Sequence, residues 1–318
     1  MATKLEDGLV DGLAPFRLKP WFSERVWGKR DLRPWYESTG TQELVGEAWL
    51  TGPECEVETG ELAGRPLGLI AEEFGEEILG MPEGGEFPLL VKILFPNDKL
   101  SVQVHPDDAQ AQAMGQPRGK TECWYVLEAE PGAAVALGLK TGSNAASVEA
   151  AIAEGTLEDL LVQVPVVKGD MVFVDAGTVH AIGPGVVLLE TQQTSDTTFR
   201  MFDYGRSRDL HVKEGLAATK FVTRAGKVAP RQMDGFVRLI EEKYFTVDRF
   251  DLEEMEEIGL VMEGPGCLVG LTGTVAVITP NEEVELLPGQ AVVIPVGCGE
   301  VILEAEHGAS FVRCVSPV

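Results

Sequence analysis

The sequence contains two copies of one short pattern, 120 residues apart. In the first copy, Gly169 precedes a run of apolar residues typical of a strand, and Gly177 follows eight positions later. Gly289 and Gly297 hold the corresponding places in the second copy. Because glycine accepts the backbone conformations of tight turns, each copy predicts a turn, a strand and a second turn. The repeat therefore predicts two related β units in one chain.

The composition agrees with a chain built mainly of strands. Its 318 residues are enough for one large domain or two ordinary ones, and the 44% of hydrophobic residues can form a substantial core. The 36 glycines and 19 prolines are typical of many short strands joined by turns. We therefore predict a mainly β protein with a few short helices, at residues 66–80, 106–114 and 146–161.

The two units differ at one position of the repeat. His180 ends the first copy, whereas Glu300 ends the second, and His307 is the single histidine of the second unit. A lone carboxylate is a poor site for a transition metal, so we predict that only the first unit holds a metal ion. The predicted division is a metal-binding domain at 1–215, a linker at 216–235 and a second, metal-free β domain at 236–318.

The charge limits the possible partners. The 51 acidic and 26 basic residues give a formal net charge of −25, which repels nucleic acid and anionic membranes. We expect a small ligand, no nucleic acid, no membrane partner, and a monomer or homodimer. The five cysteines are an odd number without a closely spaced pair, and the first residues lack an apolar signal segment. These features predict a cytoplasmic protein with reduced thiols.

One strand has a polar face that can line a pocket. Leu100, Val102 and Val104 alternate with Ser101, Gln103 and His105, and a strand sends successive side chains to opposite faces. The three polar groups therefore share one face. That face either lines a pocket or meets water, and this segment alone does not decide between the two.

Four residues of the first unit are candidate metal ligands. Two imidazoles, His105 and His180, occur with the carboxylate of Glu122 and the amide oxygen of Gln103. Such a set suits zinc or another divalent ion. The alternative is that each is an ordinary polar residue at a strand end, because no ligand pair has a diagnostic short spacing.

A second polar constellation follows at 190–200. Every even position is polar or charged, so Glu190, Asp196 and Arg200 share a face if no bulge intervenes. A buried acid and a buried arginine are costly unless they are paired or used. The alternative is a solvated edge strand, which the apolar neighbours disfavour.

Several motifs in the same order resemble those of the type I mannose-6-phosphate isomerases, in their short bacterial form. The resemblance runs from about residue 15 to the end and is strongest over 85–206. The motifs are Trp27-Gly28, Gly46-Glu47-Ala48-Trp49, Leu100 to Asp108, Gly119 to Tyr125, Gly177 to Ala181, and Thr194 to Arg200. Two departures stand out: the spacing of 58 positions from Glu122 to His180 is too short for the helical insertion of larger members, and Lys29 follows Trp27-Gly28.

This resemblance implies a cupin fold of jelly-roll barrels, here a bicupin with two such units. It also implies one zinc ion per chain, bound by Gln103, His105, Glu122 and His180. Arg200 is implied as catalytic, with Lys120 and Asp196 as further groups of the active site.

The implied reaction moves hydrogen between C1 and C2 of mannose 6-phosphate and fructose 6-phosphate, through an enediolate. Zinc and Arg200 are the candidates for holding the negative charge. The base stays open among Lys120, Glu190 and Asp196, and burial beside like charges is expected to lower the pKa of Lys120. Candidate substrate-binding residues are Lys99, Ser101, Lys120 and Arg200, within a basic cluster that also holds Lys92, Arg206 and Arg208.

A different metal cupin is the alternative function. An iron oxygenase would use a histidine-rich site, and a sugar-binding regulator would have no turnover. Lys120, Asp196 and Arg200 near the metal favour the isomerase.

Overall fold

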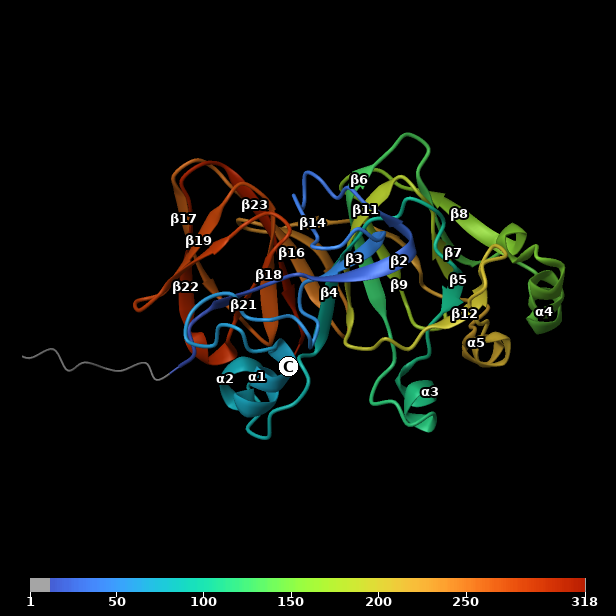
Figure 1. Ribbon diagram of the computed structural model, residues 1–318, viewed down its shortest axis with the longest axis horizontal. Coiled ribbons are helices and arrows are strands. Elements are labelled where there is room, and N and C mark those ends of the chain that lie inside the picture. Colours follow the sequence, from blue (N-terminus) through green and yellow to red (C-terminus); the bar gives the residue numbers. More distant parts are fainter. Residues whose placement is uncertain (1–11, 318) are drawn as a thin grey trace, which may run out of the picture.

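A computed structural model describes residues 12–317. It has two β sandwiches that lie side by side, with short helices at their edges (Figure 1). The prediction of a mainly β chain with few helices is therefore confirmed. Among residues 12–317, no helix has the length and apolar character needed to cross a bilayer.

The first sandwich holds the candidate site. Its larger sheet has the order β13-β9-β6-β11-β4-β3-β2, and its smaller sheet has the order β12-β5-β10-β7-β8. The strands of the larger sheet are β2 (Trp21–Lys29), β3 (Val45–Trp49), β4 (Leu89–Leu94), β6 (Glu122–Ala129), β9 (Met171–Val174), β11 (Val186–Gln193) and β13 (Gly226–Val228). Those of the smaller sheet are β5 (Val102–Val104), β7 (Ala134–Leu139), β8 (Leu161–Pro165), β10 (His180–Ile182) and β12 (Phe199–Phe202).

The second sandwich is built in the same way. Its larger sheet has the order β1-β21-β18-β23-β16-β15-β14, and its smaller sheet has the order β17-β22-β19-β20. The larger sheet comprises β1 (Phe16–Leu18), β14 (Arg231–Gln232), β15 (Val237–Glu241), β16 (Thr246–Leu252), β18 (Gly266–Thr272), β21 (Ala291–Ile294) and β23 (Ala309–Val315). The smaller sheet comprises β17 (Glu256–Val261), β19 (Val275–Ile278), β20 (Glu283–Leu286) and β22 (Glu300–Ala305).

The predicted repeat corresponds to equivalent strands of the two sandwiches. Gly169 and Gly289 both have left-handed backbone angles, with φ of 92° and 77°. Each glycine leads into a fully buried strand, β9 in the first unit and β21 in the second. His180 then begins β10, and Glu300 begins β22.

The predicted domain limits do not coincide with the strand pairing. β1 comes from the segment predicted to belong to the first domain, but it pairs with β21 of the second sandwich. Residues 216–235 contain β13, which pairs with β9, and β14, which pairs with β15. Backbone groups in these segments gain partners in one sandwich or the other, so the chain between the units is not a free linker.

The two larger sheets pack against each other and share one core. This core joins Val91 and Ile93 of β4 with Val247 of β16 and Cys314 of β23. Because side chains alternate along a strand, the residues between them point the other way, into the first sandwich. On β4 this residue is Lys92, which is only 3% exposed. The alternation thus places polar side chains in the interior of the first sandwich.

Helices form where the sequence predicted them, but they are shorter. Segment 66–80 divides into α1 (Leu67–Glu73) and α2 (Gly75–Leu79), and segment 106–114 contains α3 (Asp108–Ala113). In the third segment, α4 (Ala145–Glu154) ends at Gly155, whose φ is 74°. A glycine with left-handed backbone angles commonly ends a helix, which explains why α4 stops here. The chain then continues as the short helix η1 (Leu157–Leu160). The remaining helices are α5 (Val212–Ala218) and η2 (Val296–Cys298).

Candidate active site

The strand β5 brings the polar residues of three strands together. Gln103 lies opposite His180 of β10 on one side and opposite Arg200 of β12 on the other. Ser101 and Gln103 line a cavity of about 410 Å³ inside the first sandwich. Of the two interpretations of this strand face, the structure therefore agrees with the lined pocket.

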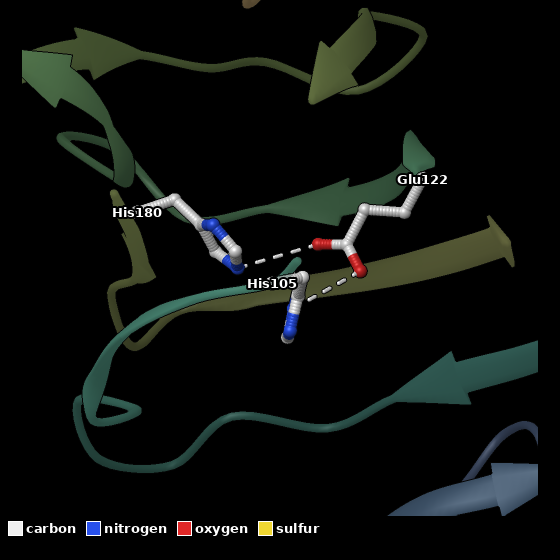
Figure 2. A group of neighbouring side chains, drawn as sticks. All are labelled: His105, Glu122 and His180. Carbon is white, nitrogen blue, oxygen red and sulfur yellow. Dashed lines mark ion pairs between the residues drawn. The ribbon is translucent and has the colours of Figure 1, made fainter. Parts of the chain in front are cut away.

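His105, Glu122 and His180 meet next to Lys120, which lines this cavity, and their side chains point toward one another (Figure 2). Their ligand atoms lie within 4.8 Å of one another. The Nε2 atom of His105 is 3.5 Å from Oε2 of Glu122, and that of His180 is 3.4 Å from Oε1. All three side chains are at most 2% exposed. Three strands or strand ends that are far apart in the sequence thus present one oxygen ligand and two nitrogen ligands to one point.

The hydrogen bonds of the two Nδ1 atoms leave the Nε2 atoms of both histidines facing Glu122. His105 Nδ1 lies 3.0 Å from the carbonyl oxygen of Thr197, and His180 Nδ1 lies 2.9 Å from that of Thr178. Each contact fixes the proton on Nδ1, so Nε2 keeps its lone pair. Oε1 of Glu122 and Nε2 of His180 are buried without a hydrogen-bond partner, whereas Oε2 of Glu122 has the Lys120 ammonium 2.9 Å away. Such orphaned acceptors are rare in proteins, and a divalent cation would satisfy them.

The charge states also suit metal binding. Burial lowers the pKa of both histidines, and the Lys120 ammonium lowers the pKa of His105 further, so both imidazoles are neutral at pH 7. Burial raises the pKa of Glu122, but Lys120 and His180 lower it by more and keep the carboxylate charged. Neutral imidazole and ionised carboxylate are the forms that bind metals. These residues therefore fit a metal ion, and the site is a candidate metal centre.

Most of the predicted site residues line the same cavity. Its lining includes Ser101, Gln103, Lys120, Glu190, Asp196 and Arg200. Lys92 and Arg208, from the predicted basic cluster, line it as well. The structure therefore places Glu190, Asp196 and Arg200 around one space, but not on one strand face as their even spacing predicted: Glu190 is on β11 of the larger sheet, Arg200 is on β12 of the smaller sheet, and Asp196 lies between the two strands.

The structure does not bring Lys99 to this cavity. Its ammonium lies 2.6 and 2.8 Å from the two carboxylate oxygens of Glu158, and the side chain is 44% exposed. Lys99 instead lines a separate hollow next to Tyr204. Lys99 lies four residues before Gln103, an even spacing that would place both side chains on one face if the strand extended back to residue 99. β5 begins at Val102, so the alternation does not extend to Lys99.

Glu190 is a buried carboxyl with two close partners. Lys92 Nζ lies 3.3 Å from Oε1, and Trp124 Nε1 donates a hydrogen bond of 3.1 Å to Oε2. Burial and the nearby Glu122 carboxylate raise the pKa of Glu190, although Lys120 and Lys92 act in the opposite direction. A carboxyl with a raised pKa can exchange a proton near neutral pH.

The prediction of a lowered pKa for Lys120 is wrong. Burial does act to lower it, but Glu122 and Glu190, with Asp196 beyond them, raise the pKa of Lys120 above its usual value. Its Nζ lies 2.9 Å from Oε2 of Glu122 and 3.2 Å from Nε2 of His105. The sequence did not reveal that carboxylates surround this ammonium more closely than cations do.

Arg200 is half-buried and incompletely paired. One terminal nitrogen donates a hydrogen bond of 2.9 Å to the carbonyl oxygen of Asp209, whereas its Nε is buried without a partner. Burial lowers the pKa of Arg200, and the neighbouring Arg208 lowers it further. A guanidinium stays charged despite such shifts, so Arg200 offers unused donors to an anion.

Sequence reasoning assigned no role to Arg25 and Glu47, which also line the cavity. Arg25 donates two hydrogen bonds of 3.1 Å to the carboxylate of Glu47, which also accepts one of 2.7 Å from Trp49 Nε1. Gly28, next to Trp27, was the sequence feature that could have indicated the close approach of the two strands that carry Arg25 and Glu47. A Cβ at Gly28 would lie 2.3 Å from the carbonyl carbon of Val45, so only glycine lets β2 approach β3 this closely.

The fold and the site define the class of protein: a two-barrel cupin with a candidate metal centre of two histidines and one glutamate in its first barrel. The family model described as the catalytic domain of type I phosphomannose isomerase matches residues 15–141.

Two curated relatives and one solved structure show similarity over nearly the whole chain. The mannose-6-phosphate isomerase of Streptococcus mutans is 33% identical, over 88% of this chain and 92% of its own length. The mannose-6-phosphate isomerase ManA of Bacillus subtilis is 33% identical, over 91% and 96%. A crystal structure of the mannose 6-phosphate isomerase from Bacillus subtilis has a TM-score of 0.83 and 28% identity, and covers 95% of this chain and 99% of that chain. The chain therefore belongs to the type I mannose-6-phosphate isomerase family.

Proposed function

We propose that the protein interconverts mannose 6-phosphate and fructose 6-phosphate, with one zinc ion per chain. The observation that carries the proposal is the group of His105, Glu122 and His180, in which Glu122 and Nε2 of His180 lack hydrogen bonds, beside a polar cavity that Gln103 and Lys120 line. The names of the relatives support the substrate and the isomerase reaction over an iron oxygenase or a sugar-binding regulator. Cytoplasmic location and a monomer or homodimer stay predictions.

The proposed metal site uses His105, Glu122 and His180, with the amide oxygen of Gln103 as a further ligand. Two imidazoles with one carboxylate favour zinc among the common divalent ions. When bound, zinc would polarise the sugar oxygens and so make the hydrogen on the neighbouring carbon more acidic.

The protein's own residues then divide the work of proton transfer. Glu190 takes the proton from C2 of mannose 6-phosphate and returns it to C1, because its raised pKa suits a group that gains and loses a proton. Asp196 lines the same cavity and stays the alternative base. The charged Lys120 is better suited to donate hydrogen bonds than to accept a proton, which reverses the role that its sequence context suggested.

Arg200 stabilises the negative charge of the enediolate. Its unpartnered Nε, and the position of the residue opposite Gln103 of β5, support this role. Among the other polar groups of the lining, Ser101 and Arg208 are the candidates for contacting the rest of the substrate, including its phosphate. Lys99 is not in this set because it does not line the cavity.

A coupled assay for fructose 6-phosphate without oxygen tests the proposal. We expect turnover of mannose 6-phosphate by the wild type, and none after His180→Asn. His307→Asn is the matched control, because His307 is exposed on the second sandwich. Absence of isomerisation by metal-loaded wild type would refute the function, and equal activity of the two variants would refute the site.

A further inference from the structure

Asp108 joins three parts of the fold that meet beside the candidate site. Its Oδ1 accepts hydrogen bonds from the backbone amide of Gly119 at 2.9 Å and from Nε2 of Gln193 at 3.0 Å. Its Oδ2 accepts a hydrogen bond from the hydroxyl of Tyr244. Asp108 closes the polar motif that begins at Leu100, yet it faces away from the cavity and has no place in the proposed reaction.

The segment from Gly119 to Thr121 is held by three hydrogen bonds, of which one is made by this carboxylate and a second depends on it through Gln193. Lys120 donates its backbone amide to the carbonyl oxygen of Pro106 at 3.0 Å. Thr121 donates its amide to Oε1 of Gln193 at 3.0 Å, and Gln193 is the residue that donates to Asp108. The next residue along the chain is the candidate metal ligand Glu122. A displacement of Asp108 would therefore move the backbone that carries two side chains of the site, those of Lys120 and Glu122.

The third partner of Asp108 comes from the second sandwich. Tyr244 lies between β15 and β16, and its ring packs on the core that the two larger sheets share. Its neighbour Phe245 is fully buried in that core, which fixes the turn. The ammonium of Lys243 lies 2.9 Å from the Tyr244 hydroxyl and 3.6 Å from Oδ2 of Asp108. Besides the shared core, the second sandwich thus contacts this part of the first one through the Tyr244 hydroxyl, which a buried neighbour holds in place, and through the longer ion pair of Lys243.

Capping of helix α3 does not account for these contacts. The cap of α3 is Asp107, whose Oδ1 accepts a hydrogen bond of 3.0 Å from the amide of Gln110. The amide of Asp107 in turn donates to the side chain of Gln110, which completes a capping box. The Asp108 carboxylate is therefore free to bind outside the helix.

We propose that Asp108 is a positioning residue through which Tyr244 of the second sandwich holds the segment 119–121, and with it Lys120 and Glu122, in place for catalysis. This gives the metal-free second unit a role in the activity of the first. The kinetic test of this inference rests on the proposed function. The structural test does not depend on that function.

The structural test is hydrogen–deuterium exchange of the peptide that contains residues 118–122, in protein without added ligand. Asp108→Ala removes the acceptor of the Gly119 amide and the partner that orients Gln193. We expect faster exchange in this peptide, with unchanged exchange in β18 and β23 of the second sandwich. Asp107→Ala is the matched control: it removes the cap of the same helix and should lower the thermal midpoint without speeding exchange at 118–122.

The kinetic test is a double-mutant cycle with Tyr244→Phe. Substitutions of residues that orient metal ligands typically cost about 10–100-fold in activity or metal affinity. We expect a fall of this size in kcat for Asp108→Ala, with KM for mannose 6-phosphate changed by less than about three-fold, since these residues orient the site without touching substrate. Tyr244→Phe should lower kcat in the wild type but not in the Asp108→Ala background. Asp108→Asn keeps an acceptor for Gly119 and should restore most of the activity.

Each result decides the proposal. Equal effects of Tyr244→Phe in both backgrounds would overturn it, as would Asp108→Ala with normal exchange at 118–122. If Asp108→Ala does not fold, Tyr244→Phe and Asp108→Asn alone still test it, because the first must speed exchange and the second must not. A wild type without isomerase activity would refute the proposed function, while the exchange data would still decide the role of Asp108.

Discussion

Replacing Arg200 by alanine should separate catalysis from stability. The side chain donates one hydrogen bond, to the carbonyl oxygen of Asp209. The backbone of residue 200 is held independently, since its carbonyl accepts a bond of 2.7 Å from the His211 amide. Losing one such side-chain hydrogen bond costs about 0.5–1.5 kcal/mol of the free energy of unfolding. In domains of 150–250 residues, about 1 kcal/mol shifts the thermal midpoint by about 2–4 °C, so Arg200→Ala should fold normally.

The loss in turnover should be much larger. Removing one donor that stabilises a developing oxyanion lowers kcat by about 10²–10³, equivalent to about 2.7–4 kcal/mol. Arg200→Lys should also be slow, because an ammonium cannot reproduce the planar fork of a guanidinium. The assay is kcat for mannose 6-phosphate, measured together with metal content and thermal midpoint. Arg231→Ala, at an arginine side chain that is 61% exposed, is the control and should behave as wild type.

Two results would refute this reasoning. An Arg200→Ala protein with more than about a third of the wild-type kcat falls far short of the expected loss, and would move charge stabilisation to Lys120. If activity disappears together with the metal or the fold, Arg200 is structural and its assigned role is wrong.

Two further substitutions test the packing around the site and in the second sandwich. A Cβ at Gly119 would lie 2.5–2.6 Å from backbone atoms of residues 106–108, at the start of α3. Gly119→Ala should therefore displace the neighbouring Lys120 and lower kcat. Gly226→Ala is the control and should not lower kcat, because a Cβ there would lie in open space. Asp248→Ala removes the fully buried carboxylate that pairs with Arg238 and Arg313. It should lower the free energy of unfolding by about 3–5 kcal/mol in a denaturant titration. The kcat of the folded protein should stay unchanged. A wild-type kcat for Gly119→Ala, or a wild-type denaturation midpoint for Asp248→Ala, would contradict these accounts.

The repeat and the strand alternation predicted much of the architecture because they depend on local physics. Gly169 and Gly289 need left-handed angles, and the strands that follow them are buried in both sandwiches. The alternation on Leu100–His105 predicted a common face for Gln103 and His105, which the structure places near His180. The sequence order of the motifs predicted the family, which the relatives show.

Features that depend on contacts between distant residues could not be predicted in this way. The pairing of Phe16 with Val293 is set by sheet packing, not by local pattern, so the sequence placed β1 in the wrong unit. The carboxylates around Lys120 come from different strands, and counting charges along the chain does not reveal which of them converge. The pairing of Lys99 with Glu158 depends on where β5 begins.

The central claim is that a metal ion held by His105, Glu122 and His180 is required for isomerisation. The most direct measurement is the rate of fructose 6-phosphate formation by chelator-treated protein as zinc is added back in known amounts. The account predicts no activity without metal, a linear rise, and a plateau at about one zinc ion per chain, as for a single site with three protein ligands. Full activity of the metal-free protein, or a plateau that needs a second ion, would contradict it.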